Sequence, residues 1–530
     1  MDAELIISGG RIFRGLAQGF THALAIADGR VLALGEEALA LAGRETRHID
    51  LRGRVAIPAF NEAHMHLIAF GLGLTQVNLR ADQVTTLAEV QARMSAAAAQ
   101  TPPGAWVLGR GYDHAALDIN RHPTSAELDE AAPHNPVFII RTCGHMGVAN
   151  SAALRAAGIG HNTPTPEGGV IERREGELTG LIQERALTLI KAAMPAPGLD
   201  ALVDAIEAGG RHLASLGFAS ATEMNLGMNA DLLEIEAYEQ ALAQGRLQQR
   251  MWLVIAANPE GIAHKAKLTP MRDASPMLRW GGAKVFADGS AGGLTAAFQD
   301  PYIQGGTGVF TFSDAEMDSL LKTYHDLGWQ LDIHAIGDAA IEQVLRAMEE
   351  AGATPDRRHR IEHCGFVNRH QRRRMLARGI IPVPQPIFMY EFGDLYVDNL
   401  GLARAEAAYP MRTWFDEGHN PSASSDAPVS TPDPFLNLFT MVTRQTNRGT
   451  VLGAAEALTI EEAVHAYTWA GAYSTFAEGT RGTLEPGMDA DVAVLSRDIF
   501  DGPAEALKTT QADITLRGGV PIHDRHAELA

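Results

Sequence analysis

The sequence carries a His-x-His triplet, His64-Met65-His66, a few residues after the apolar, strand-like segment 55–58. On a β-strand, residues i and i+2 point to the same side, so the two imidazoles can reach one metal ion. The chain contains 20 histidines, and a triplet of this kind also arises by chance or serves packing. On its own the triplet therefore leaves metal binding and a structural role as alternatives.

Further residues of chemically useful types stand at or near the ends of later strand-like segments. Lys284 interrupts an apolar segment, where a charged amine is costly to bury. Taken singly, each of these residues is explained better as a core histidine, a surface lysine or a helix-capping aspartate. Because the carboxyl ends of parallel strands meet at one face of a barrel, the residues together predict a single site there. The residues expected at that face are His64, His66, Lys284, His334, His363 and Asp426.

The segments that must position these residues alternate between predicted helices and strands from about residue 200 onward. Ser313 with Glu316 forms a capping-box signature before a helical segment, and residues 329–334 then have the apolar pattern of a buried strand. A helix at 339–350 and an extended segment at 422–425 continue the alternation. Repeated βα units favour a closed, TIM-like (β/α)8 barrel over an open parallel sheet.

Short predicted strands separated by turns occupy both ends of the chain. Residues 5–8 and 23–26 are two of the first predicted strands, and Gly9-Gly10 predicts a turn after residue 8. The last fifty residues have the same pattern. We expect both ends to build one small β-sandwich domain. Two unrelated terminal appendages are the alternative.

These patterns divide the chain into three parts. The β-sandwich domain is expected from residues 1–56 with 480–530, and the barrel from 57–67 with 196–479. Residues 68–195 do not follow the alternation, since Pro- and Gly-rich stretches interrupt them. They are predicted to be an insertion that caps the active-site face.

Composition limits the kinds of partner. The 530 residues include 44 Lys and Arg against 64 Asp and Glu, which gives a formal net charge of −20. An acidic surface repels nucleic acids and anionic membranes, which argues against both as main partners. We expect a small-molecule substrate. The two cysteines, Cys143 and Cys364, are too few for a disulfide scaffold, and the N-terminus has no signal-peptide pattern. We expect a cytoplasmic protein and a homodimer.

The ordered set of site residues resembles the metal-dependent amidohydrolase superfamily. Within it, the sequence is most similar to amidohydrolase family 3, in the YtcJ-like branch that includes N-substituted formamide deformylases. The resemblance covers nearly the whole chain and implies a metal-binding barrel with a β-sandwich shared by both termini. The segments that carry it are 57–66, 284–290, 334–338 and 425–428.

The resemblance also implies roles for the six residues. His64 and His66 hold a first divalent metal, and His334 and His363 hold a second. Lys284 is expected to react with CO₂ and to bridge the two metals as a carbamate, while a charged Lys284 paired with an acid is the alternative. Asp426 binds the first metal and acts as the catalytic base. Zn²⁺ suits such ligands, with one or two ions, and lowers the pKa of a bound water to about 7, giving hydroxide.

Two departures from the family pattern are visible. The usual Pro-Gly-Phe is Pro58-Ala59-Phe60 here, and the usual aspartate two residues before the His-x-His triplet is Glu62. Neither departure falls on a ligand position, so both leave the predicted site intact.

A second group of residues is predicted to contact the substrate. Arg141 lies in the segment 141–150, which resembles a recurring segment of the YtcJ-like branch. Structural roles are the alternative, with packing for the aromatic residues and the capping of a turn or helix for Asp288. The candidates are Arg141, His145, Trp106, Tyr112, Asp113 and Asp288.

The leading hypothesis is hydrolysis of the C–N bond of a small N-acyl or N-formyl amine or a cyclic amide, which is an activity on carbon–nitrogen bonds other than peptide bonds. An amidine or nucleobase deaminase on the same scaffold is the first alternative. By the resemblance, such deaminases lack the bridging lysine and carry a glutamate after the third histidine, whereas this chain has Lys284 and Asp338. A catalytically silent binding protein is the second alternative.

Overall fold

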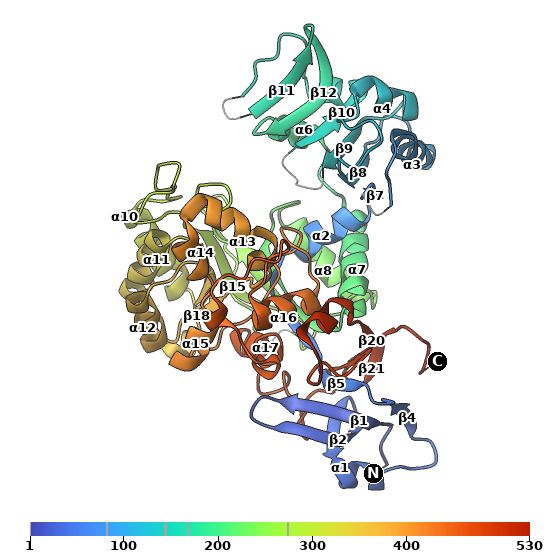
Figure 1. The fold of residues 1–530 in the computed structure, drawn as a ribbon, viewed down its shortest axis with the longest axis vertical. Coiled ribbons are helices and arrows are strands. Elements are labelled where there is room, and N and C mark those ends of the chain that lie inside the picture. Colours follow the sequence, from blue (N-terminus) through green and yellow to red (C-terminus); the bar gives the residue numbers. More distant parts are fainter. Residues whose placement is uncertain (1, 81–82, 142–145, 167–168, 273–274, 530) are drawn as a thin grey trace. The chain divides into compact units, whose positions relative to one another are not determined.

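The structure is a computed structural model, and its chain divides into two compact units (Figure 1). Met1–Phe70 and Leu202–Ala530 form the larger unit, and Gly71–Ala201 forms the smaller one. The expectation that the insertion caps the active-site face stays a prediction. The structure describes residues 2–80, 83–141, 146–166, 169–272 and 275–529.

A seven-stranded parallel sheet forms the barrel of the larger unit. Each strand pairs with the next barrel strand along the chain. The strands are almost entirely buried, as expected for a parallel sheet covered by helices. The predicted TIM-like barrel is confirmed. The strands are β6 (Phe60–Met65), β13 (Phe218–Leu226), β14 (Arg250–Ala256), β15 (Leu278–Phe286), β16 (Gln330–Ala335), β17 (Arg360–His363) and β18 (Ile381–Val383).

Residues 422–427 occupy the eighth position and close the barrel between β18 and β6. On one side the Ser422 amide donates to Pro382 O at 3.1 Å, and on the other the Asp426 amide donates to His64 O at 2.8 Å. The Ser425 amide donates to the Glu62 carboxylate instead of to the backbone. This side-chain partner interrupts the ladder, which is why the predicted extended segment is not a regular strand.

Helices follow most of the barrel strands. The Ser313 side chain accepts the Glu316 amide at the start of α10, so the predicted capping box is confirmed. None of the helices within the described ranges is long and apolar enough to cross a membrane. The helices from α7 on are α7 (Leu199–Ser215), α8 (Leu233–Ala243), α9 (Ile262–Lys265), α10 (Asp314–Asp326), α11 (Asp338–Ala351), α12 (Arg369–Arg378), α13 (Ile387–Leu400), α14 (Leu402–Glu406), α15 (Met411–Glu417), α16 (Pro434–Thr443), α17 (Ile460–Ala466) and α18 (Trp469–Ser474).

Both ends of the chain build one β domain, as predicted. In Figure 1 the blue N-terminal strands and the red C-terminal strands adjoin, and β19 pairs antiparallel with β5. Only Ala59 separates β5 from the first barrel strand, so this domain directly anchors the barrel. Its elements are β1 (Leu5–Gly15), β2 (Gly19–Ala27), β3 (Arg30–Leu34), α1 (Gly35–Ala40), β4 (Arg47–Asp50), β5 (Val55–Pro58), β19 (Val492–Leu495), β20 (Ala512–Arg517) and β21 (Val520–Asp524).

The Gly9-Gly10 pair lies inside β1, so the predicted turn at this point is wrong. The register of β1 against β2 shifts between Ser8 and Ile12, which marks a bulge. Gly9 has a φ of +80°, and a Cβ at this position would lie 2.1 Å from the Asp50 carboxylate. Glycine is therefore required here for a bulge within a strand.

The smaller unit has its own sheet and its own apolar core. Its six strands are ordered β11-β12-β10-β9-β8-β7 and mix parallel with antiparallel pairs. Helix α3 begins with a capping box between Thr86 and Glu89. The elements from α2, which crosses the boundary, to α6 are α2 (Leu67–Leu74), β7 (Val77–Asn78), α3 (Leu87–Ala99), β8 (Val107–Tyr112), α4 (Ser125–Ala131), β9 (Val137–Arg141), β10 (Met146–Ala149), α5 (Ser151–Ala156), β11 (Gly169–Arg174), β12 (Glu177–Glu184) and α6 (Leu187–Ala193).

Candidate metal centre

Three of the predicted site residues meet at the carboxyl end of the barrel. Possible ligand atoms of His64, His66 and Asp426 all lie within 4.8 Å of one another. Asp426 Oδ1 is 3.3 Å from His64 Nε2 and 3.1 Å from His66 Nε2. His64 belongs to β6 and His66 follows its last residue, while the carboxylate comes from the segment that closes the barrel beside β6. Barrel closure itself therefore assembles the group.

The hydrogen bonds of the two imidazoles leave their Nε2 atoms available. His66 Nδ1 lies 2.9 Å from Met224 O, and a carbonyl can only accept, so this nitrogen carries the hydrogen. His64 Nδ1 donates in the same way to the Glu362 carboxylate at 2.6 Å. Each Nε2 is then free to hold a cation, which is the usual arrangement around a metal-binding histidine.

This donor set fits a divalent metal. His64 Nε2 and Asp426 Oδ1 are buried without a hydrogen-bond partner among the described residues. Ligand atoms about 2.0–2.1 Å from a tetrahedral zinc lie about 3.3 Å apart, and the measured separations of 3.1 and 3.3 Å match this spacing. The lone pairs of the two Nε2 atoms repel the carboxylate oxygen that they face. A cation between these atoms would remove this repulsion.

Electrostatics at these residues favours a bound cation. Burial acts to raise the pKa of Asp426, but the nearby imidazoles of His64 and His66 outweigh it and hold that pKa well below the usual value. Burial acts to lower the pKa of His66, yet Asp426 raises it. Without a metal, the pair therefore attracts a proton to the place that a cation would take.

The other two predicted histidines adjoin this group. The ring of His363 lies 5.0 Å from that of His64 and 4.4 Å from that of His334, between centroids. His363 Nδ1 donates to Gln385 Oε1 at 2.6 Å, and His334 Nε2 donates to Gly289 O at 2.9 Å. Each imidazole thus keeps one nitrogen with a free lone pair, Nε2 in His363 and Nδ1 in His334.

Lys284 lies in β15 with only 1% of its surface exposed. Burial lowers its pKa, against the opposing charges of Glu362 and Asp426. Within the described residues no carboxylate lies within ion-pair distance of its amine, so the predicted alternative of a paired, charged lysine receives no support there. The amine instead lies 4.9 Å from the centre of the Phe286 ring.

Two charged residues that the sequence reasoning missed support the first histidine. Arg360 and Glu362 are two residues apart in β17, so both side chains point into the barrel. Arg360 Nε donates to Glu362 Oε1 at 2.8 Å and Arg360 NH2 donates to Ala63 O at 2.7 Å. The sequence does contain a sign of this pair. Two opposite charges at alternate positions of a short apolar strand indicate a buried ion pair, because each charge needs a partner there.

Gln385 was also missed and positions His363. Its amide nitrogen donates to Val383 O and to Ser424 Oγ, at 3.1 and 2.9 Å, which orients its oxygen toward the imidazole. The residue follows a proline after β18, and nothing in its local sequence marks it. Only the three-dimensional arrangement reveals its role.

The comparisons with known proteins agree with this geometry. The sequence model of the amidohydrolase family matches residues 47–523. The chain belongs to the amidohydrolase family. The predicted resemblance is therefore confirmed.

Two relatives of this amidohydrolase match along nearly all of their length. The amidohydrolase YtcJ of Bacillus subtilis (strain 168) is 30% identical over 98% of this chain and 100% of the relative. The N-substituted formamide deformylase of Arthrobacter pascens is 29% identical over 95% of both chains. Both belong to the branch that the sequence motifs predicted.

A solved structure supports the fold and the class of enzyme. An uncharacterized metal-dependent hydrolase from Pyrococcus furiosus superposes with a TM-score of 0.77, at 28% identity over 94% of this chain and 100% of the other. Family and structure together identify this amidohydrolase as a metal-dependent hydrolase.

The departure at Glu62 has a clear structural role in this amidohydrolase. Its carboxylate accepts the amides of His64 and Ser425 at 3.2 and 2.9 Å and the Tyr467 hydroxyl at 3.0 Å. One side chain thus links the strand that carries the histidines to the segment that carries Asp426. The longer side chain of glutamate serves the positioning of the ligands.

Two residues of the amidohydrolase site have left-handed backbone conformations. His363 has a φ of +66° and Asp426 a φ of +57°. Residues other than glycine adopt this region at a cost of about 1–3 kcal/mol, and such strain concentrates at functional sites. The surrounding hydrogen bonds hold these two side chains in place in spite of that cost.

Asp288 uses its carboxylate to hold loops. It accepts the amides of Ala297, Ile336 and Gly337 at 2.9–3.0 Å, and one oxygen lies 3.3 Å from His334 Nε2. These contacts match the predicted alternative, in which Asp288 caps a turn or helix. They also hold the loop that follows His334. A direct contact with substrate stays a prediction.

The structure gathers three of the other predicted substrate residues at one end of β8 and β9. Arg141 NH2 donates to Asp113 Oδ1 at 2.9 Å, and the Tyr112 hydroxyl lies 2.9 Å from His122 Nδ1. Trp106, just before β8, packs instead into an apolar cluster with Phe138. All of these residues belong to the smaller unit, so their contact with substrate remains a prediction.

Two remaining sequence predictions concern residues 142–145. Both His145 and Cys143 lie outside the described residues. Cys364 is a buried free thiol, and burial raises its pKa far above the usual value. An unreactive, structural cysteine is the consequence.

We predict that Glu362→Gln weakens metal binding about 10–100-fold, because a neutral amide orients His64 less firmly and makes its ring a poorer ligand. Competition of the purified protein with a chromophoric chelator measures this affinity directly. The matched control is Glu342→Gln, which removes a carboxylate that pairs with Arg374 near the surface. Equal metal affinity in the two folded variants would contradict the predicted role of Glu362.

Proposed function

We propose that the protein hydrolyses the C–N bond of a small N-acyl or N-formyl amine or a cyclic amide, a reaction on carbon–nitrogen bonds other than peptide bonds. The observation that carries this proposal is the cluster of His64, His66 and Asp426, whose possible ligand atoms all lie within 4.8 Å of one another. The name of one relative, N-substituted formamide deformylase, supports an amide of this kind. The substrate itself is a small molecule that the loops around the site must select.

The chain's own residues suit one or two divalent ions. His64, His66 and Asp426 would hold the first, and His334 and His363 offer lone pairs for a second. Zn²⁺ matches this set of nitrogen and oxygen donors, although metals such as Mn²⁺ and Co²⁺ share it. When bound, the metal polarises a carbonyl and lowers the pKa of water.

Lys284 would complete such a centre as a carbamate. Its buried amine is shifted toward the neutral form, and a neutral amine can attack CO₂, forming an N–C bond and releasing one proton. The product is an anionic group with two oxygens, which could contact both metal positions. This assignment turns a lysine that would repel cations into a ligand for them.

Asp426 is proposed as the group that moves the proton. Its side chain is buried and its pKa is held low by His64 and His66, so it is ionised at neutral pH. In that state it can accept a proton from the attacking water and then deliver it to the leaving nitrogen. The left-handed backbone at Asp426, with a φ of +57°, helps to hold the carboxylate beside the two histidines.

The contacts of Asp338 do not support the alternative function of a deaminase. A deaminase would need a general acid after the third histidine, but Asp338 begins α11 and its carboxylate accepts the Gln299 amide at 2.9 Å. The side chain therefore serves the packing of a loop.

The metal-loaded protein is expected to release an amine together with formate or another carboxylate from N-formyl or N-acyl amines. A panel of N-formyl, N-acyl, carbamate and amidine compounds tests this, with the products identified by mass spectrometry. Treatment with a chelator should abolish turnover, and added Zn²⁺, Mn²⁺ or Co²⁺ should restore it. Ammonia formed only from amidines would favour the deaminase, and protein that binds no metal would favour a silent binding protein.

Asp426→Asn is predicted to lower kcat by about 10² to 10⁴, since that is the usual contribution of a general acid or base. Metal content, measured by plasma mass spectrometry, should be retained in part because both histidines remain. Asp326→Asn serves as the control, since Asp326 pairs with Lys322 on an exposed helix. Turnover of Asp426→Asn equal to that of the control would contradict a role in proton transfer.

Lys284→Ala is expected to lose one metal or both, because the bridging group is removed. Metal stoichiometry and carbon-13 NMR after equilibration with labelled bicarbonate report on the bridge and on the carbamate separately. The control Lys322→Ala removes an exposed lysine. Full activity of a metal-replete Lys284→Ala protein would eliminate the bridging role while leaving amide hydrolysis intact.

A further inference from the structure

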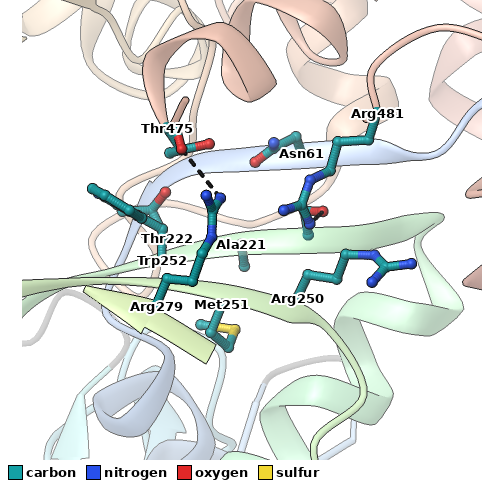
Figure 2. A pocket seen from close by; sticks show the side chains of 10 residues that line it. Asn61, Ala221, Thr222, Arg250, Met251, Trp252, Arg279, Thr475 and Arg481 are labelled. Atoms are coloured by element: carbon teal, nitrogen blue, oxygen red, sulfur yellow. Dashed lines mark hydrogen bonds between the residues drawn. The ribbon is translucent and has the colours of Figure 1, made fainter. Parts of the chain in front are cut away.

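Glu223 is a buried carboxylate that the proposed mechanism does not use. It lies in β13 and is only 2% exposed. Thr222, the residue before it, lines a small cavity on one side of the sheet, together with Trp252 (Figure 2). Because side chains alternate along a strand, Glu223 points to the other side, where it meets Tyr238 of α8. A carboxylate between a sheet and a helix that covers it needs a specific reason, because burial makes its charge costly.

The Glu223 carboxylate accepts two hydrogen bonds. The Ile68 amide donates to Oε2 at 3.0 Å, and the Tyr238 hydroxyl donates to the same oxygen at 2.5 Å. Among the described residues, no lysine, arginine or histidine forms an ion pair with Glu223. Burial raises its pKa to about 7, although the Tyr238 hydrogen bond and the charge of His66 oppose the shift. The chain thus keeps a carboxylate here without the ion-pair partner that a buried acid usually has.

The Ile68 amide belongs to the segment that directly follows a predicted metal ligand. His66 is the first residue after β6, and α2 begins at the next residue, Leu67. Ile68 is therefore in the first turn of α2, where a helix amide has no acceptor within the helix. Glu223 supplies that acceptor and so fixes the start of α2.

The next residue of β13 holds the imidazole itself. His66 Nδ1 donates to Met224 O at 2.9 Å. Two consecutive residues of β13 thus hold one short segment, Met224 through the ring of His66 and Glu223 through the backbone two residues later. The amide of His66 is held from a third side, since it donates to Ala427 O at 2.8 Å. Together these contacts set the direction in which His66 Nε2 faces Asp426.

Helix α8 carries a second buried carboxylate with a different task. Glu234 lies one turn before Tyr238 and is only 1% exposed. It accepts three amides of the loop 227–230 at 2.5–2.7 Å. Glu234 thus fixes the loop that follows β13, whereas Glu223 fixes the segment that follows His66. The two residues are matched in type and burial, so a comparison between them isolates the contact to that segment.

We propose that Glu223 is a positioning residue for His66. Its carboxylate fixes the start of α2, and this contact holds His66 where its Nε2 atom lies 3.1 Å from Asp426 Oδ1. The property that matters is the acceptance of the Ile68 amide. The inference rests on the metal binding of the proposed function and does not depend on the identity of the substrate.

Two substitutions at position 223 test this role. Glu223→Met keeps an unbranched side chain but removes both acceptor oxygens, and it should lower the affinity for Zn²⁺ about tenfold or more, as the loss of an outer contact to a metal ligand commonly does. Glu223→Gln keeps an oxygen that can accept the Ile68 amide, so it should restore most of the affinity. Competition of the purified full-length protein with a chromophoric chelator, well below Tm, measures both without a substrate.

Two results of this experiment would overturn the proposal. One is wild-type affinity in Glu223→Met, and the other is an equal loss in Glu223→Met and Glu223→Gln. A wild-type protein that binds no metal would overturn the proposed function and this inference together. That outcome is distinct from a wild type that binds metal no better than its Glu223 variants.

Glu234→Met is the matched control. It removes an equally buried carboxylate that does not contact the segment 66–68. Its Tm should fall while its affinity for Zn²⁺ stays at the wild-type value. An affinity loss as large as that of Glu223→Met would point to general loosening and would also overturn the proposal. If Glu223→Met does not fold, Tyr238→Phe decides, because it removes the hydroxyl that holds the carboxylate. It should weaken Zn²⁺ binding in the same direction, and unchanged affinity would count against Glu223.

Discussion

The hydrogen bond between His64 and Glu362 is the interaction on which the site depends most. Glu362 is completely buried and would be costly to ionise there, but Arg360 lies beside it and holds its pKa low. Arg360 in turn reaches Ala63 O in the strand of the histidines. The buried pair of Arg360 and Glu362 thus links β17 to β6 and orients the imidazole of His64. Removing Arg360 would leave the Glu362 carboxylate in the core without its compensating charge.

The sequence predicted the residues with distinctive types and missed those that depend on contact. The His-x-His triplet and Lys284 could be recognised because strand periodicity and strand ends fix where such side chains point. Gln385 could not, because its role arises from Ser424 and His363, which approach it only in the folded barrel. Gly9 was placed in a turn, because a bulge and a turn make the same demand on a glycine.

The predicted metal ligands and most of the predicted substrate residues lie in different compact units. The predicted metal ligands lie in the barrel, where hydrogen bonds orient their side chains. Predicted substrate residues such as Tyr112 and Arg141 belong to a separate compact unit with its own core. Since the two parts fold around independent cores, the smaller unit can change its sequence without disturbing the metal ligands.

The position of Asp426 on the closing segment has a thermodynamic consequence for the barrel. The Ser425 amide already joins Glu62 across 363 residues of chain. An ion held jointly by His64, His66 and Asp426 would act as a cross-link at the same place and tie almost the whole barrel into a ring. In chain-entropy terms, a staple across so long a loop restricts the unfolded chain strongly. Such an ion would therefore stabilise the closed barrel against unfolding.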